Sequence, residues 1–67
     1  MIKVKVLGGR EYVIDTEGSD LRVKELMRRL GLNTEEYVVT KSGEVITEED
    51  VVRDGDELVL YPVVSGG

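Results

Sequence analysis

Apolar and charged residues alternate strictly over residues 2–6. A period of two places successive side chains on opposite faces of an extended chain, so this segment is predicted to be a strand with one buried face. The pair Gly8-Gly9 follows, and glycine readily adopts the positive φ that tight turns require. Tyr12-Val13-Ile14 then resumes an extended apolar run. We therefore predict a β-hairpin over residues 2–15.

The apolar period changes over residues 21–32, where apolar side chains recur at intervals of three and four positions. These positions are Val23, Leu26, Met27 and Leu30. The spacing predicts one amphipathic helix whose apolar stripe faces a core. Arg22 is one candidate for the N-cap, and Ser19 or Asp20 would cap a slightly longer helix. Gly31 is predicted to end the helix in the left-handed conformation, which glycine adopts without strain.

A second hairpin is predicted after the helix. Residues 37–40 are β-branched and aromatic and predict a strand, residues 41–44 have the composition of a turn, and residues 45–46 predict a short returning strand. In residues 47–50 a polar residue is followed three positions later by a carboxylate. That pattern predicts a brief helical turn between the hairpin and the last strand.

The last strand is predicted over residues 57–61, after the turn signal Asp54-Gly55. Pro62 has no backbone N–H and should end this strand or place it at an edge. The element order predicts an α+β protein of the β-grasp, or ubiquitin-like, kind, with one main helix packed on one face of a mixed sheet of four to five strands. The first and last strands are both strongly apolar, so we place them side by side at the sheet centre. The predicted organisation is a β-grasp domain over residues 1–62 and a flexible C-terminal tail, residues 63–67, that ends in Gly-Gly.

Length and composition exclude several classes of function. A chain of 67 residues has room for one domain. The absence of Cys and His removes disulfides, the usual zinc sites, thiolate nucleophiles and imidazole bases. The formal net charge of -5 would repel a phosphate backbone, so we expect no nucleic-acid partner. We also expect no metal site, because the acidic residues lack the spacing of a calcium loop, and no membrane partner, because no stretch has the length of a membrane span. We therefore expect a cytoplasmic protein that is monomeric when free.

The end of the chain carries the most specific pattern, which is Val63-Val64-Ser65-Gly66-Gly67 after Pro62. Together with Asp54-Gly55-Asp56-Glu57 before an apolar strand, this ending resembles that of the ThiS/MoaD family of ubiquitin-like sulfur carriers, and the chain is similar to archaeal small modifier proteins. The resemblance covers the whole chain in length and element order. The short length suits the ThiS branch, whereas the residue sequence of the tail suits the MoaD branch. The resemblance therefore leaves open which sulfur-transfer pathway the protein serves.

The resemblance implies a role for each residue of the tail. A ubiquitin-activating-type adenylating enzyme would use ATP with Mg to activate the carboxylate of Gly67, and a persulfide protein would then convert it to a thiocarboxylate. Gly66 would give clearance in the partner's active site because it has no Cβ. Val63, Val64 and Ser65 would contact the partner. The chain itself would bind no cofactor and would not be an enzyme, because the catalytic groups belong to the partner.

Three functional hypotheses follow from this resemblance. A sulfur carrier would serve thiamine, molybdopterin (molybdenum cofactor) or tRNA thiolation pathways, with thiazole synthase or the large subunit of molybdopterin synthase as a partner. A protein modifier would be conjugated through Gly67 to target-protein lysines. A non-conjugated ubiquitin-like docking domain would tolerate an extension beyond Gly67. For partner docking we predict the sheet face away from the helix, where an exposed apolar patch would include Leu7, Val13, Val59 and Tyr61.

Overall fold

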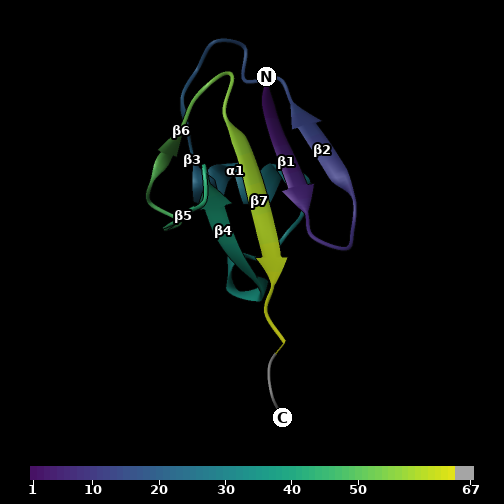
Figure 1. Ribbon diagram of the computed structural model, residues 1–67. Helices are drawn as coiled ribbons and strands as arrows, with labels where there is room; N and C mark the ends of the chain where they lie inside the picture. The colour runs from purple at the N-terminus through teal and green to yellow at the C-terminus, as the bar shows by residue number, and fades with distance from the viewer. Residues whose placement is uncertain (65–67) are drawn as a thin grey trace.

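The computed structural model describes residues 1–64 and contains one mixed sheet with a single α-helix on one face (Figure 1). In spatial order, the five strands of the sheet are β2 (Glu11–Ile14), β1 (Ile2–Val6), β7 (Glu57–Pro62), β4 (Tyr37–Lys41) and β5 (Glu44–Ile46). The remaining elements are the short paired strands β3 (Leu21–Arg22) and β6 (Val51–Val52), the helix α1 (Val23–Leu30) and the 3-10 helix η1 (Thr34–Glu36). This arrangement confirms the predicted β-grasp fold.

Strands β1 and β7 lie side by side in the middle of the sheet and run parallel, as predicted. Each of the two pairs on its other side with an antiparallel strand, β2 for β1 and β4 for β7. The register places Val4 opposite Leu58 and Val6 opposite Leu60, and all four side chains are buried. The two most apolar strands therefore occupy the centre because both of their backbone edges are paired there and one face is covered by α1.

The core lies between the sheet and α1. The helix contributes Val23, Leu26 and Met27, whose spacing of three and four residues puts all three on one face. The other buried apolar residues are Ile2, Val4, Val6, Leu21, Val39, Val52, Leu58 and Leu60. Leu30 is only partly buried, and it packs against this cluster at the end of the predicted apolar stripe. The predicted amphipathic helix is confirmed, with a shorter extent than residues 21–32.

The first turn of α1 is capped by a distant segment of the chain. Arg22 is the N-cap, as one of the predicted alternatives had it, but its side chain makes no capping hydrogen bond. Instead, the backbone N–H of Val23 donates to the carbonyl oxygen of Asp50 at 2.9 Å, and that of Lys24 donates to the carbonyl oxygen of Glu48 at 3.0 Å. Backbone carbonyls thus satisfy two of the amides that every helix leaves unpaired at its start.

The last turn of α1 ends as the sequence predicts. Gly31 has a φ of 71°, in the left-handed region. The backbone N–H of Leu32 donates to the carbonyl oxygen of Met27 at 2.9 Å, and the N–H of Gly31 donates to that of Arg28 at 3.1 Å. These two bonds define a Schellman motif, which requires a residue free to adopt positive φ. Glycine at this position therefore fixes the direction in which the chain leaves the helix.

The brief helical turn predicted at residues 47–50 is a single hydrogen-bonded turn, in which the N–H of Asp50 donates to the carbonyl oxygen of Thr47 at 3.1 Å, and no helix forms there. Thr47 and Asp50 do make the predicted cap contact, since the N–H of Thr47 donates to Asp50 Oδ2 at 2.7 Å. The turn does not continue as a helix, because the next residues form β6 and pair with β3, with Val52 opposite Leu21. Both of those side chains are buried in the core. The burial of Val52 therefore outweighs the local preference for a helical start, and the sequence analysis missed both short strands.

Thr16 carries a stability prediction of its own. Its side chain is buried, and its hydroxyl has no hydrogen-bond partner within residues 1–64. An unpaired buried hydroxyl costs about 1–3 kcal/mol, and valine has a similar shape without it. We expect Thr16→Val to raise the free energy of unfolding in urea by about 1 kcal/mol. Thr16→Ser keeps the hydroxyl and removes a methyl group, so it should lower that free energy by about 1 kcal/mol. A Thr16→Val variant less stable than the wild type would contradict the prediction.

Candidate functional site at the carboxyl end of β7

Strand β7 leads the chain out of the sheet toward the predicted tail, at the end of the molecule opposite Met1 (Figure 1). Pro62 is the last residue of the strand and lies opposite Tyr37 of β4. Strand β7 ends at Pro62, as predicted for a residue that has no N–H to donate. Beyond it, Val63 is 50% exposed and Val64 is 88% exposed. The predicted partner-contacting valines are therefore accessible from solvent.

The rest of the predicted reactive segment consists of Ser65, Gly66 and Gly67, which lie outside the described residues. The roles assigned to them, with Gly67 as the covalent attachment point, stay predictions. The structure contributes the position from which this segment starts. That position is the end of a central strand, which pairs with β1 as far as Leu60 and with β4 as far as Pro62.

An apolar row crosses the sheet face opposite α1, next to the start of the tail. Val38 of β4 lies directly opposite Tyr61 of β7, so the two side chains share that face. On the other side, Leu7 follows the buried Val6, and its N–H donates to the carbonyl oxygen of Leu60 at 2.9 Å. This apolar row of Leu7, Val38 and Tyr61 is 51%, 37% and 42% exposed. The structure thus brings two of the predicted docking residues together beside the tail.

Val38 was missed by the sequence analysis. Residues 37–40 were assigned to a strand, but two consecutive valines, Val38 and Val39, leave the inward face undecided when the sequence is taken alone. The pairing with β7 decides it, because Val39 lies opposite the buried Leu60 and Val38 opposite Tyr61. Consistent alternation across all three strands was the signal that could have identified Val38.

The other two predicted docking residues are placed differently. Val59 is half-buried, and its neighbours in the register are Lys5 of β1 and Thr40 of β4, whose hydroxyl donates to the carbonyl oxygen of Val59 at 3.0 Å. Val13 is exposed but lies on β2 opposite Lys3. Val59 therefore adjoins the apolar row, whereas Val13 is separated from it by the lysines of β1. Docking at these residues stays a prediction.

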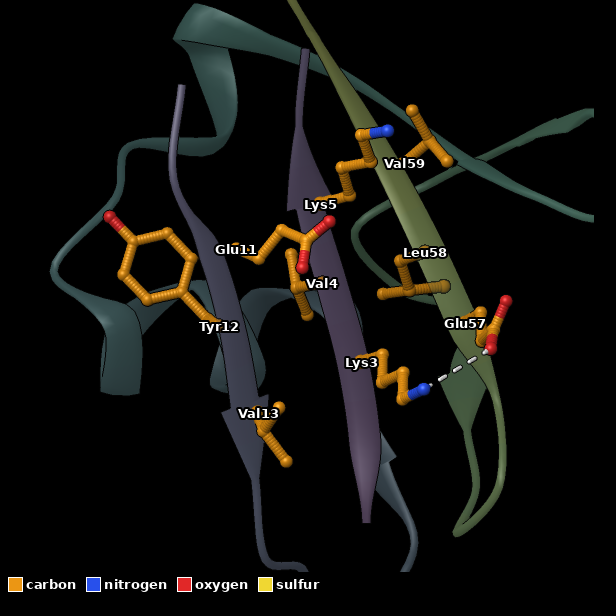
Figure 2. A pocket seen from close by; sticks show the side chains of 9 residues that line it. All are labelled: Lys3, Val4, Lys5, Glu11, Tyr12, Val13, Glu57, Leu58 and Val59. Carbon is orange, nitrogen blue, oxygen red and sulfur yellow. Dashed lines mark ion pairs between the residues drawn. The ribbon is translucent and has the colours of Figure 1, made fainter. Parts of the chain in front are cut away.

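A shallow hollow of about 270 Å³ lies between β2, β1 and β7 in this region (Figure 2). Figure 2 shows Lys3 and Lys5 of β1 between Glu11 of β2 and Glu57 of β7. The Nζ atom of Lys3 lies 4.0 Å from a carboxylate oxygen of Glu57, and both side chains are largely exposed. Two lysines and two glutamates leave the hollow without net charge. Exposed pairs of this kind contribute little to stability. The hollow is the polar part of this sheet face, and its side chains form no catalytic arrangement.

The acidic turn at residues 47–50 is joined to the start of α1 by ion pairs. Glu49 accepts hydrogen bonds from Lys24 Nζ at 3.1 Å and from Arg22 Nη1 at 2.7 Å. These contacts, with Lys24 as the larger contributor, lower the pKa of the Glu49 carboxyl below its ordinary value. Within residues 1–64, no three acidic side chains converge as a metal site would require.

Asp56 forms a second specific contact, in the loop before β7. The backbone N–H of Arg53 donates to Asp56 Oδ2 at 2.8 Å, and Lys41 Nζ lies 3.0 Å from the same oxygen. The amide of Arg53 is the main cause, and Lys41 a further one, of a pKa for the Asp56 carboxyl below its ordinary value of 3.8. Both contacts favour the ionised form, since each presents a donor to the negative charge.

This lowered pKa predicts how stability depends on pH. A carboxyl whose pKa is lower in the folded state contributes stability that is present above its unfolded pKa and is lost as the pH falls through its folded pKa. We expect Asp56→Asn to lower the free energy of unfolding at neutral pH, and its difference from the wild type to shrink below about pH 4. Urea unfolding at a series of pH values measures this. Glu35→Gln removes one charge from an exposed position away from Lys41 and controls for charge alone. An Asp56→Asn effect that is the same at every pH would contradict the expectation.

The fold, the central parallel strand pair and the exposed exit of β7 define a ubiquitin-like β-grasp protein. The family model described as ThiS family matches residues 5–67, and the chain belongs to the ThiS family. An uncharacterized protein of Archaeoglobus fulgidus is 32% identical over 66 residues, which cover 98% of this chain and 97% of that protein. The sulfur carrier protein TtuB of Thermus thermophilus is 40% identical over 45 residues, covering 67% of this chain and 69% of TtuB.

Solved structures agree with the family. SAMP1 from Haloferax volcanii superposes with a TM-score of 0.71 at 25% identity, covering 98% of both chains. A thiamine biosynthesis protein from Geobacter metallireducens gives a TM-score of 0.59 at 31% identity, covering 97% of this chain and 87% of that one. The protein is therefore a sulfur carrier or small modifier of the ubiquitin-like type, and such sulfur carriers are carrier proteins and not catalysts. No helix in residues 1–64 has the length and apolar character needed to cross a membrane.

Proposed function

We propose that this protein carries sulfur as a thiocarboxylate on Gly67, after a ubiquitin-activating-type enzyme has adenylated that residue. The observation that carries the proposal is the ThiS-family match through residue 67, on a chain whose last described residue, Val64, is 88% exposed beyond a firmly paired strand. A terminus used as a carrier must reach into another protein while its domain stays folded. The exit from β7 meets that requirement.

The proposed chemistry takes only the terminal carboxylate from this chain. An α-carboxyl group has a pKa of about 3.5, so it is ionised at neutral pH. Its oxygen attacks the α-phosphorus of ATP, which the partner enzyme binds with Mg, and pyrophosphate leaves to give an acyl adenylate. A persulfide sulfur of a donor protein then attacks the acyl carbon and displaces AMP. A thiol of the donor then cleaves the S–S bond of the resulting acyl disulfide, which releases the thiocarboxylate and leaves a disulfide on the donor.

The site residues have proposed roles in this sequence of steps. Gly67 carries the reactive group, Gly66 gives clearance, and Ser65 with the two preceding valines contacts the walls of the partner's active site. The apolar row of Leu7, Val38 and Tyr61 lies beside the start of this segment, where a partner holding the terminus would meet it. Docking there would bury apolar side chains that are exposed in the free protein.

The acceptor of the sulfur is proposed from the relatives. The structural match to a thiamine biosynthesis protein supports thiamine synthesis, with thiazole synthase as the partner. The similarity to TtuB supports the role of sulfur carrier in general. Molybdopterin synthesis, with the large subunit of molybdopterin synthase, and tRNA thiolation remain further acceptor pathways for the same thiocarboxylate.

A second candidate function is protein modification. The same acyl adenylate would be attacked by a lysine amine of a target protein, giving an isopeptide bond to Gly67. The fold similarity to SAMP1 over 98% of both chains supports this alternative. Both functions begin with adenylation of the terminus, so they are separated by the second nucleophile, sulfur or nitrogen.

The intact mass of the protein tests these functions. The purified chain is incubated with ATP, Mg, a cognate activating enzyme and a persulfide donor, alongside a chain that lacks Gly67. We expect a mass increase equal to one oxygen-for-sulfur exchange in the full chain and none in the truncated one. An unchanged mass together with branched tryptic peptides that carry residues 54–67 on lysines of other proteins would favour the modifier. If neither signal is observed, only the hypothesis of a docking domain remains.

A further inference from the structure

One backbone hydrogen bond joins the start of the tail to a distant turn. The N–H of Val63 donates to the carbonyl oxygen of Glu36, the last residue of η1, at 2.8 Å. We propose that η1, with Asn33 as its cap, anchors the tail at Val63 and so positions the terminus for activation. This inference rests on the proposed function and assigns Asn33 as a positioning residue.

Side-chain and backbone contacts hold η1 in the shape that presents this carbonyl. Asn33 is the N-cap, and its Oδ1 atom accepts the backbone N–H of Glu35 at 2.9 Å. The N–H of Glu36 donates to the carbonyl oxygen of Asn33 at 3.0 Å. The hydroxyl of Thr34 donates to Glu48 at 3.1 Å, which links η1 to the turn that caps α1. The Glu36 carbonyl is thus oriented by a capped turn, and this turn leads directly into β4.

The bond extends the pairing of β4 with β7 by one residue, because Glu36 and Val63 come next in the register after Tyr37 and Pro62. The strands themselves end at Tyr37 and Pro62, and proline supplies no N–H. Among residues 1–64, the amide of Val63 is the last backbone donor that has an acceptor. That acceptor is the carbonyl oxygen of Glu36 in η1. The folded body consequently extends one residue beyond the strand. Residues 64–67 can then span at most about 14 Å, which sets the distance from Val63 at which the partner's nucleotide can lie.

Releasing this anchor would lengthen the part of the chain that must be ordered when the terminus enters the partner. Ordering the backbone of one additional residue lowers the efficiency of activation by roughly 5- to 30-fold. The loss should fall on activation and not on the stability of the domain, because the contact lies outside the core.

The test compares Asn33→Ala with Asn33→Asp, which keeps an acceptor oxygen at the cap. We expect Asn33→Ala to lower kcat/KM for adenylation by roughly 5- to 30-fold, and Asn33→Asp to stay near the wild-type value. Amide hydrogen exchange followed by NMR reports the anchor directly. In the wild type the Val63 amide should exchange more slowly than the Val64 amide, and Asn33→Ala should abolish the difference. Urea unfolding checks that the variants stay folded.

A second pair of variants acts on the donor. Val63→Pro removes the N–H, whereas Val63→Ala keeps it, and both lose the valine side chain. We expect Val63→Pro to be activated less efficiently than Val63→Ala. Equal activation within this pair, or wild-type activation of Asn33→Ala, would overturn the positioning role alone. A wild-type chain that is never adenylated would refute the proposed function and the positioning role with it, even if the Val63 amide is protected.

Discussion

Leu60→Ala is expected to leave the protein largely unfolded at room temperature. Leu60 is fully buried on β7, between Val6 of β1 and Val39 of β4 in the register. Removing a buried leucine side chain costs about 2–5 kcal/mol, because apolar contacts are lost and a cavity is left. The single core of a domain this small supplies about 3–5 kcal/mol in total, so this one substitution removes most of the margin.

Urea unfolding followed by circular dichroism measures this effect. Val45→Ala on β5 is the matched control, because Val45 is 71% exposed and its truncation should change the free energy of unfolding by less than about 0.5 kcal/mol. If Leu60→Ala has no folded baseline, Leu60→Val gives a measurable loss of about 1 kcal/mol. Wild-type stability of Leu60→Ala would contradict the central position assigned to β7.

Gly66→Ala is expected to lower the rate of adenylation by about 100-fold while leaving the fold intact. The proposed activation requires the terminus to enter a confined channel, where an added Cβ collides with the wall and disfavours positive φ. A displacement of the reacting carboxylate by about 1 Å is enough for a loss of this size. The substituted residue follows the last strand in the sequence, and we expect the free energy of unfolding to stay unchanged.

Pyrophosphate release with the cognate activating enzyme measures the rate for Gly66→Ala. Ser65→Ala is the comparison, because it alters the neighbouring residue without adding a Cβ, and its effect should be smaller. Urea unfolding of both variants checks the domain. Equal rates for Gly66→Ala and the wild type would refute the role of Gly66 as the residue that gives clearance.

The two kinds of surface around the exit of β7 suit different tasks. The apolar row of Leu7, Val38 and Tyr61 can bury area against a partner, whereas the lysines and glutamates of the neighbouring hollow form a polar rim without net charge. Rim charges of this kind influence orientation and association rate more than affinity. The net charge of -5 therefore resides mainly elsewhere on the chain, in its turns and loops.

The sequence by itself determined the elements whose signals are local. The alternation over residues 2–6 predicted β1, and the spacing of three and four residues predicted the buried face of α1. Gly31 predicted the end of the helix, because the Schellman motif needs positive φ at that residue. The central pairing of β1 with β7 followed from their apolar content alone. In each case the physical cause lies within a few residues or in the hydrophobic pattern of a whole strand.

Only the tertiary structure decided how distant backbone groups pair. The carbonyls of Glu48 and Asp50 cap α1, β3 pairs with β6, and Glu36 receives the amide of Val63. Val38 joined the exposed apolar row for the same kind of reason, because its face depends on the register with β7. A backbone N–H or C=O is present at nearly every position whatever the side chain, so its partner has no signature in the sequence. These contacts form only when the packing of the core has brought the segments together.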